Sequence, residues 1–207
     1  MVPLLNIRNS ALKHVKASTV FIDSPFGYSV DKLWDLPKHV WKEDYWLEIL
    51  KSLEKRMQES GLLVVFGDLF KVYPPLHAAI THWNSDHGKK WIAVPPLFYN
   101  KRNHTNKGTG PYANSVELAF LYYWSSVPRI GKLPYELNGN LIEGNKTGDL
   151  LHGLADYHNP CQKPNVLLKL LLENHAEEKT LVIDLTAGSF TSFLAVLQLT
   201  KETFWVG

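Results

Sequence analysis

Residues 181–191 give the clearest indication of the fold, and they read Leu181-Val182-Ile183-Asp184-Leu185-Thr186-Ala187-Gly188-Ser189-Phe190-Thr191. It begins as an apolar run long enough for a buried strand, which is closed by an acid and then by a glycine. An earlier stretch of the same kind reads Val20-Phe21-Ile22-Asp23-Ser24-Pro25-Phe26-Gly27. In open α/β sheets such strand ends face the ligand crevice, so we expect Asp23 and Asp184 to point into a pocket.

The segments around these two stretches alternate between strand and helix patterns. We expect strands at 18–22, 62–66, 91–94, 97–99, 116–124, 180–185 and 203–206, and helices at 46–57, 76–83, 164–171 and 191–199. The first helix is expected to end at Gly61, and 100–113 reads as a long polar loop. This alternation predicts an α/β fold, a mostly parallel sheet with helices on both faces.

Bulk properties limit the class of protein. A chain of 207 residues is expected to form one domain, 1–207. The single Cys161 excludes an internal disulfide, and no apolar run approaches the roughly 20 residues that cross a bilayer. We therefore expect a soluble intracellular protein, in the cytoplasm or in the nucleus or nucleoid, with no membrane association. No His or Cys stands in a metal-ligand spacing, so we expect no metal.

Taken together, the two stretches resemble the permuted, beta-class-like family of S-adenosylmethionine-dependent DNA amino-methyltransferases, which modify adenine N6 or cytosine N4. That family binds the base with an acid-Pro-Pro-aromatic motif and the cofactor with Asp-Pro-Phe-x-Gly-x-Gly-Thr. The resemblance implies a Rossmann-like methyltransferase fold in circularly permuted order. The base-binding half would span about 15–125 and the cofactor half about 158–207.

Asp23, Pro25 and Phe26 match the base motif and are the expected catalytic residues. Methylation of an exocyclic amine needs an acceptor for its N–H, so that the nitrogen lone pair turns toward the methyl donor. It also needs an aromatic face on which the extruded base stacks. Asp23 and Phe26 would fill these two roles. The alternative interpretation is a strand that ends in an Asx-type turn, with a packed Phe.

The expected cofactor-binding residues come from the second stretch and from an element just before it. Lys163-Pro164, followed by Leu167-Leu168, matches the family's Lys-Pro-x-x-Leu-Leu, which lies beside the methionine part of S-adenosylmethionine. The full set is Lys163, Pro164, Asp184, Gly188, Ser189 and Thr191. The alternatives are a helix that begins at proline beside a solvated lysine, and a plain tight turn at Gly188.

Three departures from the family pattern bear on cofactor affinity. Ser24 replaces the first proline of the base motif, and Phe190 replaces the second glycine of the cofactor motif. The family's acid for the ribose hydroxyls is due where the sequence ends at Gly207, so the acid was either lost or cut off with the rest of a longer chain. A lost polar contact in a buried site costs about 1–3 kcal/mol, so we expect S-adenosylmethionine to bind weakly.

The basic loop that holds Lys101, Arg102 and Lys107 is expected to contact phosphates, although a solvated charged face is the alternative. A net charge of +2 is modest for a DNA-binding domain, so a second copy of the chain in a homodimer, or a heteromeric partner, is expected to contribute part of the affinity for DNA.

Two functions follow from these observations. The first is methyl transfer to an exocyclic amine of a nucleic-acid base, with DNA expected rather than RNA. Adenine N6 is expected rather than cytosine N4, because the motif begins with Asp where the family's cytosine enzymes usually carry Ser. The alternative is a catalytically inactive methyltransferase-like subunit that binds nucleic acid or acts as a scaffold in a complex.

Overall fold

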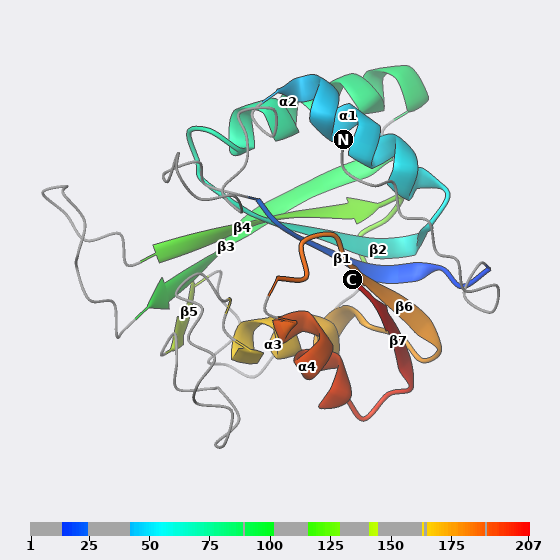
Figure 1. Ribbon diagram of the computed structural model, residues 1–207. Coiled ribbons are helices and arrows are strands. Elements are labelled where there is room, and N and C mark those ends of the chain that lie inside the picture. The colour runs from blue at the N-terminus through cyan, green and yellow to red at the C-terminus, as the bar shows by residue number, and fades with distance from the viewer. Residues whose placement is uncertain are drawn as a thin grey trace, which may run out of the picture.

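The computed structural model describes residues 14–24, 42–88, 90–101, 116–128, 141–144, 163, 165–188 and 190–207. Strands and helices follow one another along the chain (Figure 1). They are β1 (Ala17–Asp23), α1 (Glu43–Glu54), β2 (Met57–Phe66), α2 (Tyr73–His87), β3 (Trp91–Lys101), β4 (Val116–Trp124), β5 (Leu141–Gly144), α3 (Asn165–His175), β6 (Thr180–Asp184), α4 (Thr191–Leu197) and β7 (Thr203–Val206).

All of these strands join one sheet, in the order β5-β3-β4-β2-β1-β6-β7. β4 pairs antiparallel with both of its neighbours, and every other neighbouring pair is parallel. β1 lies between β2 and β6, so the two stretches quoted above become adjacent strands, neither of which is at an edge of the sheet. The predicted α/β fold with a mostly parallel sheet is confirmed.

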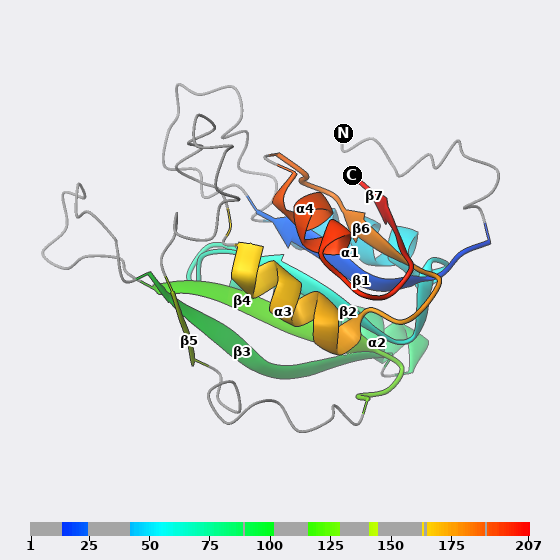
Figure 2. The ribbon, with the colours of Figure 1, turned by 90° about the horizontal axis from the view of Figure 1, so that it is seen from below.

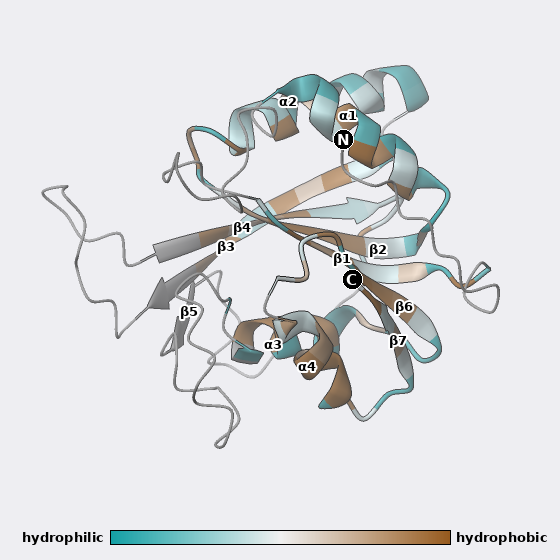
Figure 3. Cartoon of the chain, in the orientation of Figure 1, coloured by the Kyte–Doolittle hydropathy of each residue, from teal (hydrophilic) through white to brown (hydrophobic). Residues whose placement is uncertain are grey.

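Helices cover both faces of the sheet. Figures 1 and 2 show α1 and α2 on one face and α3 and α4 on the other. Successive side chains of β1 point to opposite faces of the sheet and contribute to both hydrophobic layers. Val20 and Ile22 pack toward the α1–α2 side, and Phe21 packs toward the α3–α4 side. Figure 3 shows hydrophobic residues along the inner strands and on α3 and α4. Full burial of such side chains contributes about 1.5–3 kcal/mol each.

One expected element boundary is wrong. The helix predicted from 46 to 57 and closed by Gly61 ends at Glu54, and Met57 already begins β2. The pairing of β1 with β2 passes from Ala17–Met57 to Thr19–Leu62, so the strand bulges at 58–61. Ser60 has φ +62 there, and a Cβ on Gly61 would lie 2.8 Å from Cε of Met57. The Ser-Gly signal therefore marks a bulge rather than a helix end.

The other expected elements are found, with shifts of a few residues at their ends. The two short strands at 91–94 and 97–99 form the single strand β3, whose register shifts between Val94 and Leu97 where two prolines stand. Asn100 and Lys101 belong to β3, and the rest of the expected loop lies outside the described residues. Among the described helices, none is both long and apolar enough to cross a membrane.

Candidate functional site

The carboxyl ends of β1 and β6 lie side by side. Phe21 is the Cα partner of Asp184 on β6, and Asp23 is the partner of Phe66 on β2. Because these strands are parallel, their ends meet at one edge of the sheet. The structure therefore brings Asp23 and the loop after Asp184 together at this edge, as the sequence predicts.

Asp23 is held by residues that are distant in the sequence. Its backbone N–H donates to Oγ1 of Thr186 over 2.6 Å, and its carboxylate Oδ2 accepts from Nζ of Lys163 over 2.8 Å. The Lys163 side chain is 6% exposed and that of Asp23 is 31% exposed. The Lys163 ammonium also lies 5.4 Å from the centre of the Phe66 ring. Asp23, the expected base acid, thus contacts two residues that lie 140 or more positions later in the sequence.

Ser24, which replaces the first proline of the family motif, prolongs the pairing of β1. Its N–H donates to the carbonyl oxygen of Phe66 over 3.0 Å. Proline has no N–H and could not make this bond. Ser24 is 1% exposed, and its hydroxyl has no hydrogen-bond partner among the described residues. The departure at Ser24 therefore fixes the backbone directly after Asp23.

Asp184 organises the loop between β6 and α4. Its Oδ1 accepts from the backbone N–H of Thr186 over 2.9 Å and from Oγ1 of Thr186 over 3.3 Å. Its Oδ2 accepts from the hydroxyl of Ser192, which in turn accepts from Nε1 of Trp205 over 3.0 Å. Burial raises the pKa of the Asp184 carboxyl, and the hydrogen bonds from Ser192 and Thr186 act against this shift. Asp184 shapes the loop through these bonds.

Thr186 and Ser192 are site residues that sequence reasoning missed. Thr186 stands two residues after Asp184, which is the spacing of an Asx-type turn. This spacing could have indicated from the sequence that Thr186 bonds to Asp184. For Ser192 the sequence offers no comparable signal, because its contact with Trp205 joins α4 to β7.

Gly188 and Phe190 give the loop its backbone shape. Gly188 has φ +33, and a Cβ there would lie 3.3 Å from the carbonyl oxygen of Thr186. Phe190 has φ +56, which is unusual for a residue with a side chain. Its side chain is 53% exposed and its ring centroid lies 5.8 Å from that of Trp205. Thr191, the first residue of α4, is 4% exposed.

Several expected site residues lie outside the described residues: Pro25, Phe26, Arg102, Lys107, Pro164 and Ser189. The backbone of Lys101 ends β3. Since β3 and β1 run in the same direction in the sheet, that end lies at the same edge as Asp23.

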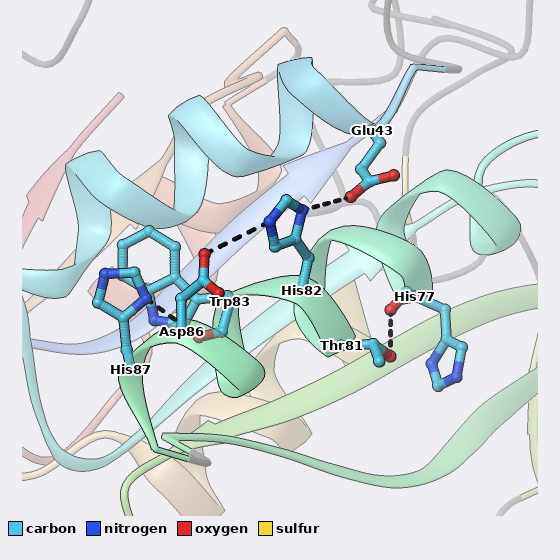
Figure 4. Close-up of polar contacts among 7 residues, drawn as sticks. All are labelled: Glu43, His77, Thr81, His82, Trp83, Asp86 and His87. Carbon is cyan, nitrogen blue, oxygen red and sulfur yellow. Dashed lines mark hydrogen bonds and ion pairs between the residues drawn. The ribbon is translucent and has the colours of Figure 1, made fainter.

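A second group of polar side chains lies on α2, on the outer side of the α1–α2 layer (Figure 4). His82 contacts Glu43 of α1 over 2.9 Å and Asp86 over 3.4 Å. The hydrogen bond to Glu43, and then the charge of Asp86, raise the pKa of His82. The described part of the chain holds no group of three or more His, Cys, Asp or Glu that could bind a metal ion. This group is an exposed link between two helices.

Comparisons with known proteins agree with the architecture. No protein-family model and no curated protein sequence matches the chain. Among solved structures, it is similar to M1.HpyAVI in complex with SAM, at 14% identity and a TM-score of 0.62, over 96% of this chain and 86% of that one. PvuII DNA methyltransferase, which is cytosine-N4-specific, gives 17% identity and a TM-score of 0.67, over 92% and 74%.

A putative DNA modification methylase of Thermus thermophilus, complexed with S-adenosyl-L-methionine, gives 16% identity and a TM-score of 0.52, over 93% and 81%. At such identities the likeness concerns the fold. The chain therefore has the fold of a cytosine-N4-specific DNA methyltransferase and of two proteins crystallised with S-adenosylmethionine.

Proposed function

We propose that this protein transfers a methyl group from S-adenosylmethionine to an exocyclic amine of a nucleic-acid base, namely adenine N6 in DNA. The observation that carries the proposal is the position of Asp23. Its backbone is held by Thr186 and its carboxylate by Lys163, at the sheet edge where the glycine loop follows β6. Two proteins of the same fold are crystallised with this cofactor.

The residues at this edge fit S-adenosylmethionine. The loop at 185–190 exposes backbone at Gly188, where a side chain would crowd the Thr186 carbonyl. Two residues near Asp23 and Lys163 in the sequence also carry buried polar groups. The Ser24 hydroxyl and the Oδ1 oxygen of Asn165 are buried and have no hydrogen-bond partner among the described residues. Such groups suit a ligand that carries ammonium, carboxylate and hydroxyl groups.

For this reaction the protein mainly has to position the amine and the methyl donor relative to each other. When bound, S-adenosylmethionine supplies a sulfonium methyl group, which the amine takes by forming an N–C bond while the S–C bond breaks and sulfur keeps its electron pair. The Asp23 carboxylate accepts an amine N–H, which turns the nitrogen lone pair toward the methyl carbon, and it takes the proton that the nitrogen sheds. Phe26 stacks on the extruded base.

The choice of adenine rests on the acid at the first position of the motif. A carboxylate accepts hydrogen bonds from an amine and donates none when it is ionised. A serine in its place, as in the family's cytosine enzymes, could both donate and accept. Because PvuII DNA methyltransferase shares this fold and is cytosine-N4-specific, both bases belong in the substrate test.

DNA contact is proposed to run through Lys101, which ends β3, and through Arg102 and Lys107 beyond it. With His104 as a fourth potential cation, these residues release about three to four counterions, which gives a salt slope of about 3–4 at most. Binding by a single copy of the chain should therefore be weak, and a second copy or a partner should tighten it.

The proposal is tested by calorimetry with S-adenosylmethionine together with transfer of labelled methyl to DNA. We expect weak binding at millimolar ligand and detectable transfer. Asp23→Asn should abolish transfer and leave cofactor affinity within about threefold, because the Asp23 carboxylate is proposed to contact the amine and not the cofactor. Asp86→Asn, a change at an exposed carboxylate on α2, is the matched control and should keep both. Transfer by Asp23→Asn at the wild-type rate would remove Asp23 from the mechanism.

A further inference from the structure

The ion pair between Lys163 and Asp23 is the most deeply buried charged contact that the structure shows at the candidate site. Nζ of Lys163 lies 2.8 Å from Oδ2 of Asp23, and the lysine side chain is 6% exposed. Helix α3 begins at Asn165, two residues after Lys163, and is anchored by Leu167, Leu168 and Leu172, which are buried against the sheet. The packing of α3 thus holds the helix that follows Lys163 against the sheet.

A buried ammonium needs a counter-charge, because removing it from water without one is costly. Asp23 supplies that charge in the structure, and the face of Phe66 adds a cation–π contact at 5.4 Å. The charge of the Lys163 ammonium is therefore already paired with the carboxylate of Asp23. A residue that bound the cofactor's own carboxylate would have to divide its charge between two anions.

We propose that Lys163 is a positioning residue for Asp23 rather than a ligand of S-adenosylmethionine. This inference rests on the proposed function. The terminal torsion of an aspartate is broad, so a fixed backbone alone does not orient its carboxylate. The bonds at Thr186 and Ser24 fix the backbone, and Lys163 fixes the plane of the carboxylate by binding one of its oxygens. A carboxylate has about four acceptor sites, so it can bind Lys163 and an amine N–H together.

The proposal separates two effects that a cofactor ligand would combine. If Lys163 orients Asp23, its loss lowers kcat and leaves the affinity for S-adenosylmethionine unchanged. If Lys163 binds the cofactor, its loss raises the Kd and the KM for S-adenosylmethionine. Lys163→Met keeps the aliphatic stem and removes the charge. Lys169→Met on α3 is the matched control, because Lys169 is a half-exposed lysine of the same segment.

We expect Lys163→Met to lower kcat about 100-fold, which is the scale of a small misplacement of a reacting group, with the cofactor Kd within about threefold. Lys169→Met should leave both unchanged. A rise of about tenfold or more in the Kd for Lys163→Met would overturn the proposal, as would a kcat within about threefold of wild type.

Stability measurements test the pair without any activity. Thermal unfolding is compared for the wild type, Asp23→Asn, Lys163→Met and the double variant. Asp23→Asn leaves a buried lysine without its partner, so the double variant should have a Tm at or above that of Asp23→Asn. Losses in Tm that simply add would overturn the proposal. Absence of methyl transfer by the wild-type chain would instead refute the proposed function, and the two failures are thereby distinguished.

Discussion

Single side chains join segments that are far apart in the sequence. The Thr186 hydroxyl accepts from the backbone N–H of Asp23 and donates to the carboxylate of Asp184. It therefore links the end of β1 to the end of β6 in addition to the ladder between the two strands. The Ser192 hydroxyl likewise donates to the carboxylate of Asp184 and accepts from the indole N–H of Trp205, so it links α4 to β6 and β7.

Replacing Thr186 by Val keeps the shape of the side chain and removes its hydroxyl. The N–H of Asp23 then loses its acceptor, so we expect a loss of about 1–3 kcal/mol in the free energy of unfolding. Thr186→Ser keeps the hydroxyl and should lose clearly less. Urea unfolding of the two variants measures the difference, and equal stability of Val and Ser variants would show that the bond contributes nothing.

His175 makes stability depend on pH below neutrality. Burial, and then the charge of Lys201, lower the pKa of His175 to about 4, and its ring lies beside Tyr123. The folded pKa is below the unfolded value of about 6.5, so the unfolded chain binds more protons between these values. The stabilisation is present above pH 6.5 and is lost as the pH falls toward 4.

We expect this loss to reach about 3 kcal/mol for the wild type. His175→Gln should lose less stability over the same pH range, because glutamine does not titrate. Urea unfolding at pH 7 and at pH 4.5 makes the comparison, and parallel losses in the two proteins would contradict the assignment to His175.

At the scale of elements, the β2–α2 connection depends on close approach of the backbone at Gly67. A Cβ at Gly67 would lie 2.6 Å from Cγ1 of Val72, which is fully buried and cannot move aside. Asp68 supports the same turn, since its Oδ1 accepts from the backbone N–H groups of Phe70 and Lys71. This turn leaves the edge of the sheet that holds Asp23.

Gly67→Ala is therefore expected to lower the free energy of unfolding by about 1–3 kcal/mol through overpacking. Gly88→Ala is the control. Gly88 ends α2 with φ +77 and nothing lies within 4 Å of a Cβ there, so only backbone strain of about 1–2 kcal/mol is expected. Thermal unfolding compares the two, together with a test of activity. A Gly67→Ala protein with unchanged activity and stability would contradict the packing argument.

The sequence predicts elements best where hydrophobic periodicity is long. The two middle strands that carry Asp23 and Asp184 follow from apolar runs, and α2 follows from its spacing of buried residues. The sequence-based prediction is wrong at the end of α1. Met57 continues the apolar spacing of the helix, but it is the first residue of β2 and joins the core from that strand. β5 had no pattern that could reveal it, since its four residues stand in a stretch rich in Gly and Asn.

At the scale of the whole molecule, the site comes from the order of the strands. β1 pairs with β6, which lies far along the chain, and this pairing brings Asp23 to the loop that follows β6. The apolar runs before Asp23 and Asp184 indicate that these two residues approach this edge, and the resemblance of Lys163-Pro164 to a family motif places Lys163 in the same expected site. The sequence does not predict that Lys163 pairs with Asp23, because this contact depends on the register of segments that are distant in the chain.

The most direct test of methyl transfer to adenine identifies the nucleoside that receives the methyl group. The purified chain is incubated with deuteromethyl-labelled S-adenosylmethionine and double-stranded DNA, and the digested nucleosides are analysed by mass spectrometry. We expect label in N6-methyldeoxyadenosine for the wild type and none for Asp23→Asn. Label in N4-methyldeoxycytidine would contradict the choice of base. No label in any nucleoside, from a folded chain that binds S-adenosylmethionine, would contradict the proposed activity.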